Sequence, residues 1–326
     1  MNTEKKTLSI QWMKAHAMDL ASYGGLILCI LIFSIIPPFL GENIWSPAKL
    51  STLMSDVIVT ALMAVGAMFV YTLGNMDISI GAQVGIYATL MVLLGNMTGS
   101  LFAGIILAFV IAVILGAING SVGELLRIYP VIPSIVCRMV LEGLRSVIYN
   151  KVGSRNMSLR GIDYSIFKQT WFMILVLVIE VVVVFILFNY TRLGKFAKAI
   201  GANKAVAKQS GISIVKYKAI FYIIMGICVV VAAMFQMGYT GSASDSTGTG
   251  FEMNVMVALI LGGMPLSGGM TAKISCAVRG AFTFSLLDVG LPLIGVPNNV
   301  TFLIKAVIFI VVVLMTCRKK GGALPK

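Results

Sequence analysis

Four ionisable residues lie inside long apolar runs of this chain, where a charged side chain is costly. They are Asp56, Glu142, Glu180 and Lys305. On insertion scales each costs about 2.5–3.5 kcal/mol at the centre of a bilayer, so each should face other helices or water rather than lipid. Carboxylates in this position serve proton relays in ion-coupled transporters, but these three acids form no evident relay. A structural ion pair and a functional role both remain open for each of the four.

The chain offers little for metal, redox or nucleotide chemistry. His16 is the single histidine, which excludes a multi-histidine metal site, and the five cysteines contain no C-x-x-C pair. An odd number of cysteines at irregular spacing is poor material for disulfides. Neither a G-x-x-x-x-G-K-[ST] phosphate loop nor a G-x-G-x-x-G turn is present. We therefore expect no cofactor, no metal and no catalytic residue, and an ATPase, if one is used, on a separate chain.

Two glycine-interrupted segments resemble each other. Residues 73–81 and 261–269 agree at five positions, and both follow one apolar run and precede another. Interrupted segments repeated in the halves of a transporter point to the substrate pathway. This predicts pathway residues in and beside the two turns: Asn75, Asp77, Ser79, Ser267 and Gly268. The alternatives are chance similarity in a Gly- and Met-rich chain and, for Asp77, an N-cap of the following span.

One polar loop is strongly basic. From Arg192 to Lys218 it contains seven basic residues and no acidic one. Asn203 can cap a short helix over 204–209, and Gly211 can end it. A helix this short is unstable alone, so we expect it to rest on a partner surface. The alternative is an ordinary positive-inside loop, which composition alone would favour.

The elements that must hold these residues are membrane-spanning helices. Hydrophobic residues make up 59% of the 326 positions and charged residues 11%, far from the composition of a soluble domain. The fold class is therefore all-α and polytopic, with about ten transmembrane helices in two related halves. The expected spans are 20–40, 50–72, 81–95, 100–122, 131–149, 171–189, 219–238, 251–263, 275–292 and 300–317. The third and eighth are short for a full crossing, which predicts broken or half-helices there.

Charge sets the expected orientation. Seventeen basic residues fall in the segments on the N-terminal side of the membrane and four on the other side, so the positive-inside rule places both termini and the 190–218 loop in the cytoplasm. The segments are then a cytoplasmic 1–19, a permease domain over 20–317 with the first run retained as a span, and a cytoplasmic tail over 318–326. The same distribution explains the net charge of +13 without nucleic acid as a partner.

An ordered set of motifs resembles the ribose-type permeases of ABC importers, in the group that also includes branched-chain amino-acid permeases. The resemblance runs from about Leu50 to Val313. The segments that carry it are 64–66, 76–81, 191–194, 199–203, 210–212, 248–252, 261–269, 293–296 and 305–306. The chain departs from the family pattern at Asn75, at 270–273 and at 287–289, which bears on the substrate more than on the fold.

The resemblance implies partners and site residues. A second permease chain, two ATP-binding subunits and an extracytoplasmic substrate-binding protein would complete the importer in the bacterial inner membrane. Lys305 gains a structural or pathway role. The basic loop is similar to the segment that meets the ATPase, which assigns the coupling to Gly201, Ala202, Asn203, Ala205, Ala207 and Gly211.

The predicted function is therefore the permease subunit of an ABC importer for a sugar, not an enzyme itself. Another small solute, such as a branched-chain amino acid or a nucleoside, is the alternative within that class. An ion-coupled secondary transporter is the alternative outside it.

Overall fold

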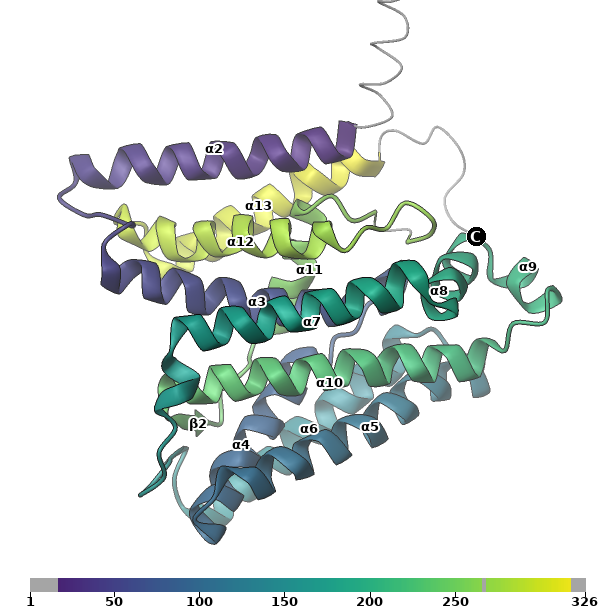
Figure 1. Ribbon diagram of the computed structural model, residues 1–326, viewed down its shortest axis with the longest axis horizontal. Coiled ribbons are helices and arrows are strands. Elements are labelled where there is room, and N and C mark those ends of the chain that lie inside the picture. The colour runs from purple at the N-terminus through teal and green to yellow at the C-terminus, as the bar shows by residue number, and fades with distance from the viewer. Residues whose placement is uncertain (1–16, 266–267, 318–326) are drawn as a thin grey trace, which may run out of the picture.

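The computed structural model describes residues 17–265 and 268–317 as a bundle of long helices that lie mostly along one direction (Figure 1). The helices that correspond to the predicted spans are α2 (Ala17–Phe39), α3 (Pro47–Thr72), α4 (Ile80–Thr98), α5 (Leu101–Leu125), α6 (Val131–Val152), α7 (Thr170–Tyr190), α10 (Ile214–Thr240), α11 (Phe251–Leu261), α12 (Ser275–Leu293) and α13 (Asn298–Cys317). Each of the ten predicted spans overlaps one of them, so the all-α polytopic prediction is confirmed.

Within the described residues, seven helices are long and apolar enough to cross a membrane: α2, α3, α4, α5, α7, α10 and α12. Helix α6 has the length but carries several charges. Helix α11, the predicted eighth span, has 11 residues, so the expectation of a short segment is confirmed there. It is wrong for the third span, because α4 has 19 residues. The error arose because Asn96 interrupts the apolar run, although the helix continues to Thr98.

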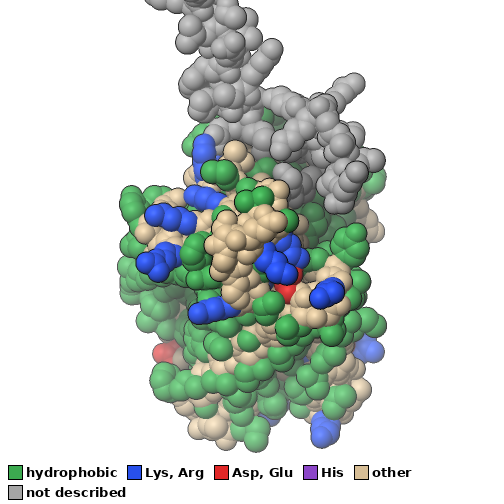
Figure 2. Space-filling view, turned by 90° about the vertical axis from the view of Figure 1, so that its right-hand side faces the viewer, with side chains coloured by type: hydrophobic (Ala, Val, Ile, Leu, Met, Phe, Trp, Pro, Cys, Tyr) green, Lys and Arg blue, Asp and Glu red, His purple; other side chains and the backbone are tan. Residues whose placement is uncertain are grey.

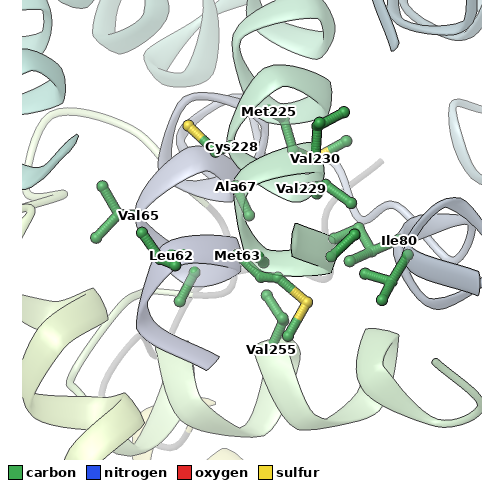
Figure 3. Close-up of a cluster of buried hydrophobic side chains, with 14 of the residues drawn as sticks. Leu62, Met63, Val65, Ala67, Ile80, Met225, Cys228, Val229, Val230 and Val255 are labelled. Carbon is green, nitrogen blue, oxygen red and sulfur yellow. The ribbon is translucent and has the colours of Figure 1, made fainter. Parts of the chain in front are cut away.

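Helix α3 is the centre of the bundle. It contacts α7, α10, α11 and α12, and nearly all its residues from Val57 onward are buried. Figure 3 shows its Leu62, Met63 and Val65 among side chains of α10 and α11. A Cβ at Gly66 would collide with Cys228 of α10. Small residues on α3 thus let α10 approach closely, as is usual where helices pack within a membrane.

The two ends of the bundle differ. At one end a two-stranded antiparallel sheet joins β1 (Asn156–Ser158) to β2 (Ser242–Ser244), next to the 3-10 helix η1 (Ser165–Lys168). At the opposite end lie the short helices α8 (Arg192–Ala202) and α9 (Lys204–Gln209) (Figure 1). The following sections call these the sheet end and the α9 end.

Candidate functional site

Asp77 is the centre of a buried hydrogen-bond network at the start of α4. Ser79 donates to its Oδ1 from the backbone N at 2.6 Å and from Oγ at 2.5 Å. Asn119 of α5 donates from Nδ2 to Asp77 Oδ2 at 3.0 Å. The network continues through Gln83, whose Nε2 donates to Ser79 Oγ at 2.8 Å. The acid therefore fastens the turn before α4 to α5.

This geometry corrects the N-cap alternative for Asp77. Ser79 occupies the N-cap position of α4, and Asp77 accepts from the N–H two residues later, which is an Asx turn. Both Asp77 and Ser79 are buried, while Asn75 is half-buried. The Nδ2 of Asn75 has no hydrogen-bond partner in the part of the chain that the structure describes. Of Asn75, Asp77 and Ser79, Asn75 is thus the residue with an unpaired side-chain donor. A pathway role for all three stays a prediction.

The two similar segments both begin as helix-ending turns. Gly74 after α3 and Gly263 after α11 have positive φ, of 73° and 91°. In each case the next N–H bonds back five residues, from Asn75 to Val70 O and from Met264 to Leu259 O. The structural match is therefore Gly74 with Gly263, one residue away from the sequence match. The similarity reflects a shared way of ending a helix.

The first turn contacts the end of the second segment, Gly268–Gly269, at the α9 end. Gly269 donates its N–H to Thr72 O at 2.8 Å, and a Cβ at Gly268 would lie 2.5 Å from Gly74 N. A Cβ at Gly201, on the last turn of α8, would also collide with Thr72 O. Ser267 lies outside the described residues. The glycines therefore allow three backbone segments to touch, and we call this contact the glycine junction (Thr72–Gly74, Gly268–Gly269 and Gly201).

Lys305 has a partner inside the chain. Its Nζ forms an ion pair with Asp288 of α12, and it lies over the rings of Phe284 and Phe302. The Lys305 side chain is buried and that of Asp288 is half-buried. Asp288 belongs to the departure from the family pattern at 287–289, and it supplies the charge that neutralises the lysine. The pair joins α12 to α13, so the structural role assigned to Lys305 has a clear physical basis.

Sequence reasoning singled out Glu142 but missed the two arginines that form a charged stripe with it on α6. Arg138, Glu142 and Arg145 recur at helical spacing near the middle of this helix. Arg138 bonds Glu142 at 2.8 Å through Nε and Glu252 of α11 at 2.7 Å through Nη1. Arg145 donates to Thr247 O at 2.6 Å. The signal was present, because three charges with i, i+4 and i+7 spacing lie within the predicted span 131–149.

The segment 245–250 packs directly against α4. A Cβ at Gly81 would collide with Gly248 O and Glu252, and one at Gly85 would collide with Arg145. Gly248 itself has a φ of 80°. Chain segments without regular structure are tolerated at membrane depth where they are covered by protein. Because Gly81 and Gly85 have no side chains, the 245–250 segment can lie directly against the backbone of α4, which covers it.

The short helix in the basic loop is confirmed as α9. Asn203 Oδ1 accepts from the N–H groups of Ala205 and Val206 at 3.0 and 3.1 Å, and Gly211 ends the turn with a φ of 82°. Ala202 and Ala205 are exposed. Ala207, expected on the outer surface, is instead buried against the bundle, because it lies on the opposite side of α9. Val206, its neighbour in the sequence, is exposed on the outer surface instead.

Glu124 ties α9 to the bundle, a link that sequence reasoning missed. Its carboxylate pairs with Lys204 of α9 at 2.7 Å and with Lys218 of α10 at 2.8 Å. The Lys218 side chain is only 4% exposed, and that of Glu124 13%. Figure 2 shows the surrounding end of the molecule with lysine and arginine side chains spread over it. The α9 end is therefore basic outside, with one acid that holds two of its lysines.

Residues 49–313 match the family model described as branched-chain amino acid transport system / permease component. The chain belongs to this family. The ribose import permease protein of Escherichia coli (strain K12) is 26% identical over 340 residues, covering 98% of this chain and all of the relative. The ribose import permease protein of Bacillus subtilis (strain 168) is 26% identical over 327 residues, covering 99% and 98%. The galactose/methyl galactoside import permease protein of Haemophilus influenzae is 28% identical over 203 residues, or 60% of each chain.

The family match confirms the resemblance inferred from the motifs between Leu50 and Val313. A permease needs a path for its solute between the helices and a surface on which its energy source acts. In this permease the glycine junction lies at the α9 end, and the charged stripe lies near the middle of α6.

Proposed function

We propose that this chain is the membrane-spanning permease subunit of an ABC importer that takes up a sugar. The observation that carries the proposal is the end-to-end similarity to ribose import permeases from two bacteria. A galactofuranose transporter permease of Escherichia coli, 23% identical over 90% of this chain, adds support. ATP would be hydrolysed by two separate subunits, since the sequence has no phosphate loop. A second permease chain and an extracytoplasmic binding protein complete the proposed importer.

The α9 end is the proposed docking surface for the ATP-binding subunits. Helix α9 presents Ala205 and Val206 outward, and small or apolar residues permit close approach of another surface. Gly201 connects the same segment to the glycine junction, where the turn after α3 touches Gly268 and Gly269. A movement imposed on α8 and α9 would therefore reach the end of α3 and the Gly268–Gly269 segment without an intermediate element. This contact supports a coupling role for 201–211.

Replacing Ala205 and Val206 with glutamate tests the docking surface. The two acids add bulk and reverse the charge of a basic, exposed surface, and unfavourable charge contacts at an interface cost several kcal/mol. We expect loss of co-purified ATP-binding subunit and of uptake, with normal amounts of permease in the membrane. The control is Lys151→Glu, which places a glutamate at an exposed position of the sheet end. If the double variant kept both the bound ATP-binding subunit and normal uptake, the loop would serve only to fix the topology.

The substrate is tested by uptake in cells lacking this permease. Radiolabelled D-ribose, D-galactose and L-leucine should be compared in the deleted and complemented strains. We expect restored uptake of one of the sugars. Uptake of leucine alone would replace the sugar by the substrate in the family description, while leaving the permease function intact.

Energy coupling separates the ABC importer from an ion-coupled transporter. The candidate acids Asp56, Glu142 and Glu180 lie on three helices, and Glu142 is held by Arg138. We expect uptake into vesicles that contain ATP and no ion gradient. Uptake that needs a proton or sodium gradient and ignores ATP would favour the secondary transporter.

A further inference from the structure

The depth of helix α7 in the membrane follows from its length and from the aromatic residues near its ends. It has 21 residues and, apart from Glu180, no charged side chain. At about 1.5 Å per residue it is about 30 Å long, which is the thickness of the hydrocarbon core of a bilayer. Trp171 and Tyr190 are exposed near its two ends, and such residues gather at the level of the lipid headgroups. The residues that follow Tyr190 therefore lie at headgroup level.

Helix α8, at the end of α7 (Figure 1), begins at this level and stays beside the last turn of α7. A Cβ at Gly194 would collide with Phe188 O, and Lys198 Nζ lies 4.6 Å from the centre of the Phe188 ring. The first two turns of α8 thus touch one residue of α7. Helix α8 buries Gly194, Ala197 and Ile200, so its opposite face is the one that is open to the surroundings.

Two basic residues lie on that open face. Arg192 and Lys195 are three positions apart, so their side chains are neighbours on one side of the helix, and both are exposed. Among the residues that the structure describes, neither forms an ion pair. No acid occurs from Arg192 to Lys218, and Glu124 is taken by Lys204 and Lys218. The two charges are therefore available to an anion from outside the chain.

An exposed apolar strip of α7 leads directly to these two residues. Val182, Ile186 and Tyr190 follow one another at four-residue spacing, and all are exposed. The ring of Phe185 packs edge-on against that of Tyr190, with the centroids 6.0 Å apart. Arg192 comes two residues after Tyr190, so a phospholipid whose acyl chains lie along the strip has its headgroup beside Arg192.

Lipid suits this strip better than a second permease chain does. Helices that pack together within a membrane meet through small residues, above all Gly, Ala and Ser. Helix α7 contains none of the three. Its exposed side consists of branched and aromatic side chains, which are typical of a surface in contact with acyl chains.

We propose that Arg192 and Lys195 bind the headgroup of an anionic phospholipid whose acyl chains lie along the exposed strip of α7. The planar guanidinium of Arg192 can bond two phosphate oxygens at once, and Lys195 adds a compact positive charge. The first turn of α8 contains no acid, and the helix dipole there favours a negative group. A zwitterionic headgroup carries a cationic group beside its phosphate, which the two basic residues repel. The class of ligand is therefore a phospholipid with a net negative charge.

The lipid would not occupy the proposed docking surface for the ATP-binding subunits. That surface is on α9, where Ala205 and Val206 are exposed, whereas the lipid contacts α7 and the outer face of α8. The lipid site is also independent of the solute that the permease carries.

Lipid-dependent melting tests the site. The full-length permease is purified in a neutral detergent, and its melting temperature is measured with phosphatidylglycerol or phosphatidylcholine of the same acyl chains. We expect phosphatidylglycerol to raise the melting temperature several degrees more. Each basic residue beside an anionic lipid surface increases affinity about fivefold. Arg192→Gln with Lys195→Gln should therefore need about tenfold or more phosphatidylglycerol for the same rise. Arg192→Lys with Lys195→Arg keeps both charges and should retain the response.

The control removes two charges from the opposite end. Lys151→Gln with Lys168→Gln changes exposed residues at the sheet end and should leave the response to phosphatidylglycerol unchanged. An equal loss in this control would make the effect one of net charge and would overturn the site. Native mass spectrometry of the same variants counts the phosphatidylglycerol molecules retained, and we expect fewer on the α8 double variant alone.

Three further outcomes would contradict the proposal. The first is an unaltered protein that responds equally to phosphatidylglycerol and phosphatidylcholine. The second is an equal rise in melting temperature with inorganic phosphate, which would assign the two residues to a free anion. The third is an α8 double variant that keeps its preference for phosphatidylglycerol but no longer co-purifies with the ATP-binding subunit. Arg192 and Lys195 would then bind that protein.

Discussion

At the scale of single residues, Asp77 shows how a buried acid can serve a turn. Its two oxygens accept from Ser79 and from Asn119, which lie on different elements. A buried polar group that loses its partner costs about 1–3 kcal/mol. The identity of each partner therefore matters as much as the negative charge.

Exchanging Asp77 and Asn119 tests whether the hydrogen bond between them or the position of the negative charge matters. In Asp77→Asn alone, an amide nitrogen or the loss of one acceptor leaves Asn119 poorly paired, so we expect reduced thermal stability and reduced uptake. The double variant Asp77→Asn with Asn119→Asp restores a donor opposite an acceptor and should recover much of both. Melting of the purified protein and uptake in vesicles are the measurements. A double variant no better than the single one would show that the charge must lie on α4's side.

Removing the charge of Glu124 should lower the stability of the protein more than Asp77→Asn does. Glu124→Gln leaves the buried Lys218 without its counter-charge, and breaking a buried pair by removing one partner costs about 3–5 kcal/mol. We expect a clear fall in the melting temperature of the detergent-purified protein. Glu42→Gln is the matched control, since Glu42 and Lys49 are exposed and 4.0 Å apart, and exposed pairs contribute about 0–1 kcal/mol. Equal shifts in the two variants would show that Glu124 does not hold α10.

At the scale of elements, the contact between α4 and the 245–250 segment depends on glycine. Gly85→Ala places a methyl group against Arg145 and 2.6 Å from Thr247 O, so the segment must move away from α4. We expect lower stability and impaired uptake. Gly24→Ala in α2 is the control, because its Cβ would meet nothing within 4 Å. Equal tolerance of both changes, measured by melting and uptake, would contradict the packing.

The sequence predicts elements better than it predicts partners. The spans follow from apolar length, and α9 follows from Asn203 and Gly211, because these signals are local. Helix α8 was not predicted, since its residues contain no cap signal beyond Thr191, whose Oγ1 accepts from Leu193 N at 3.2 Å.

The candidate site was harder to predict because its contacts are distant in sequence. Asn119 lies 42 residues from Asp77, and Lys218 lies 94 from Glu124. Ala207 was misplaced because a six-residue helix gives too few positions to reveal which side is buried. The charges of α6 were visible within one predicted span, and their spacing would have placed all three on one side of the helix.

At the scale of the whole molecule, the two ends have different chemistry. The exposed basic residues of the α9 end include Arg192, Lys195, Lys204, Lys208 and Lys216. The sheet end displays Lys151, Arg155, Arg160 and Lys168, together with the exposed acids Asp163 and Asp245. The positive-inside rule then predicts that the α9 end faces the cytoplasm.

Labelling from outside the cell tests this orientation. Lys151→Cys and Lys195→Cys, made separately after removal of the native cysteines, exchange the same residue type at exposed positions of the two ends. We expect an impermeant thiol reagent to label Lys151→Cys in intact cells and Lys195→Cys only after the membrane is opened. The reverse pattern would invert the topology and move the docking surface to the outside.

The ion pair between Arg138 and Glu252 also bears on the order in which the chain enters the membrane. Helix α6 carries Arg138, Glu142 and Arg145, and on insertion scales each charge opposes entry by about 2.5–3.5 kcal/mol. Its distant counter-charge, Glu252, lies 114 residues later and is still untranslated when α6 leaves the ribosome. We therefore expect the first half of the protein to remain beside the insertion machinery, with α6 sheltered by α4 and α5, until α11 has been synthesised. Biogenesis of this permease would then be a delayed assembly of helices rather than ten independent insertions.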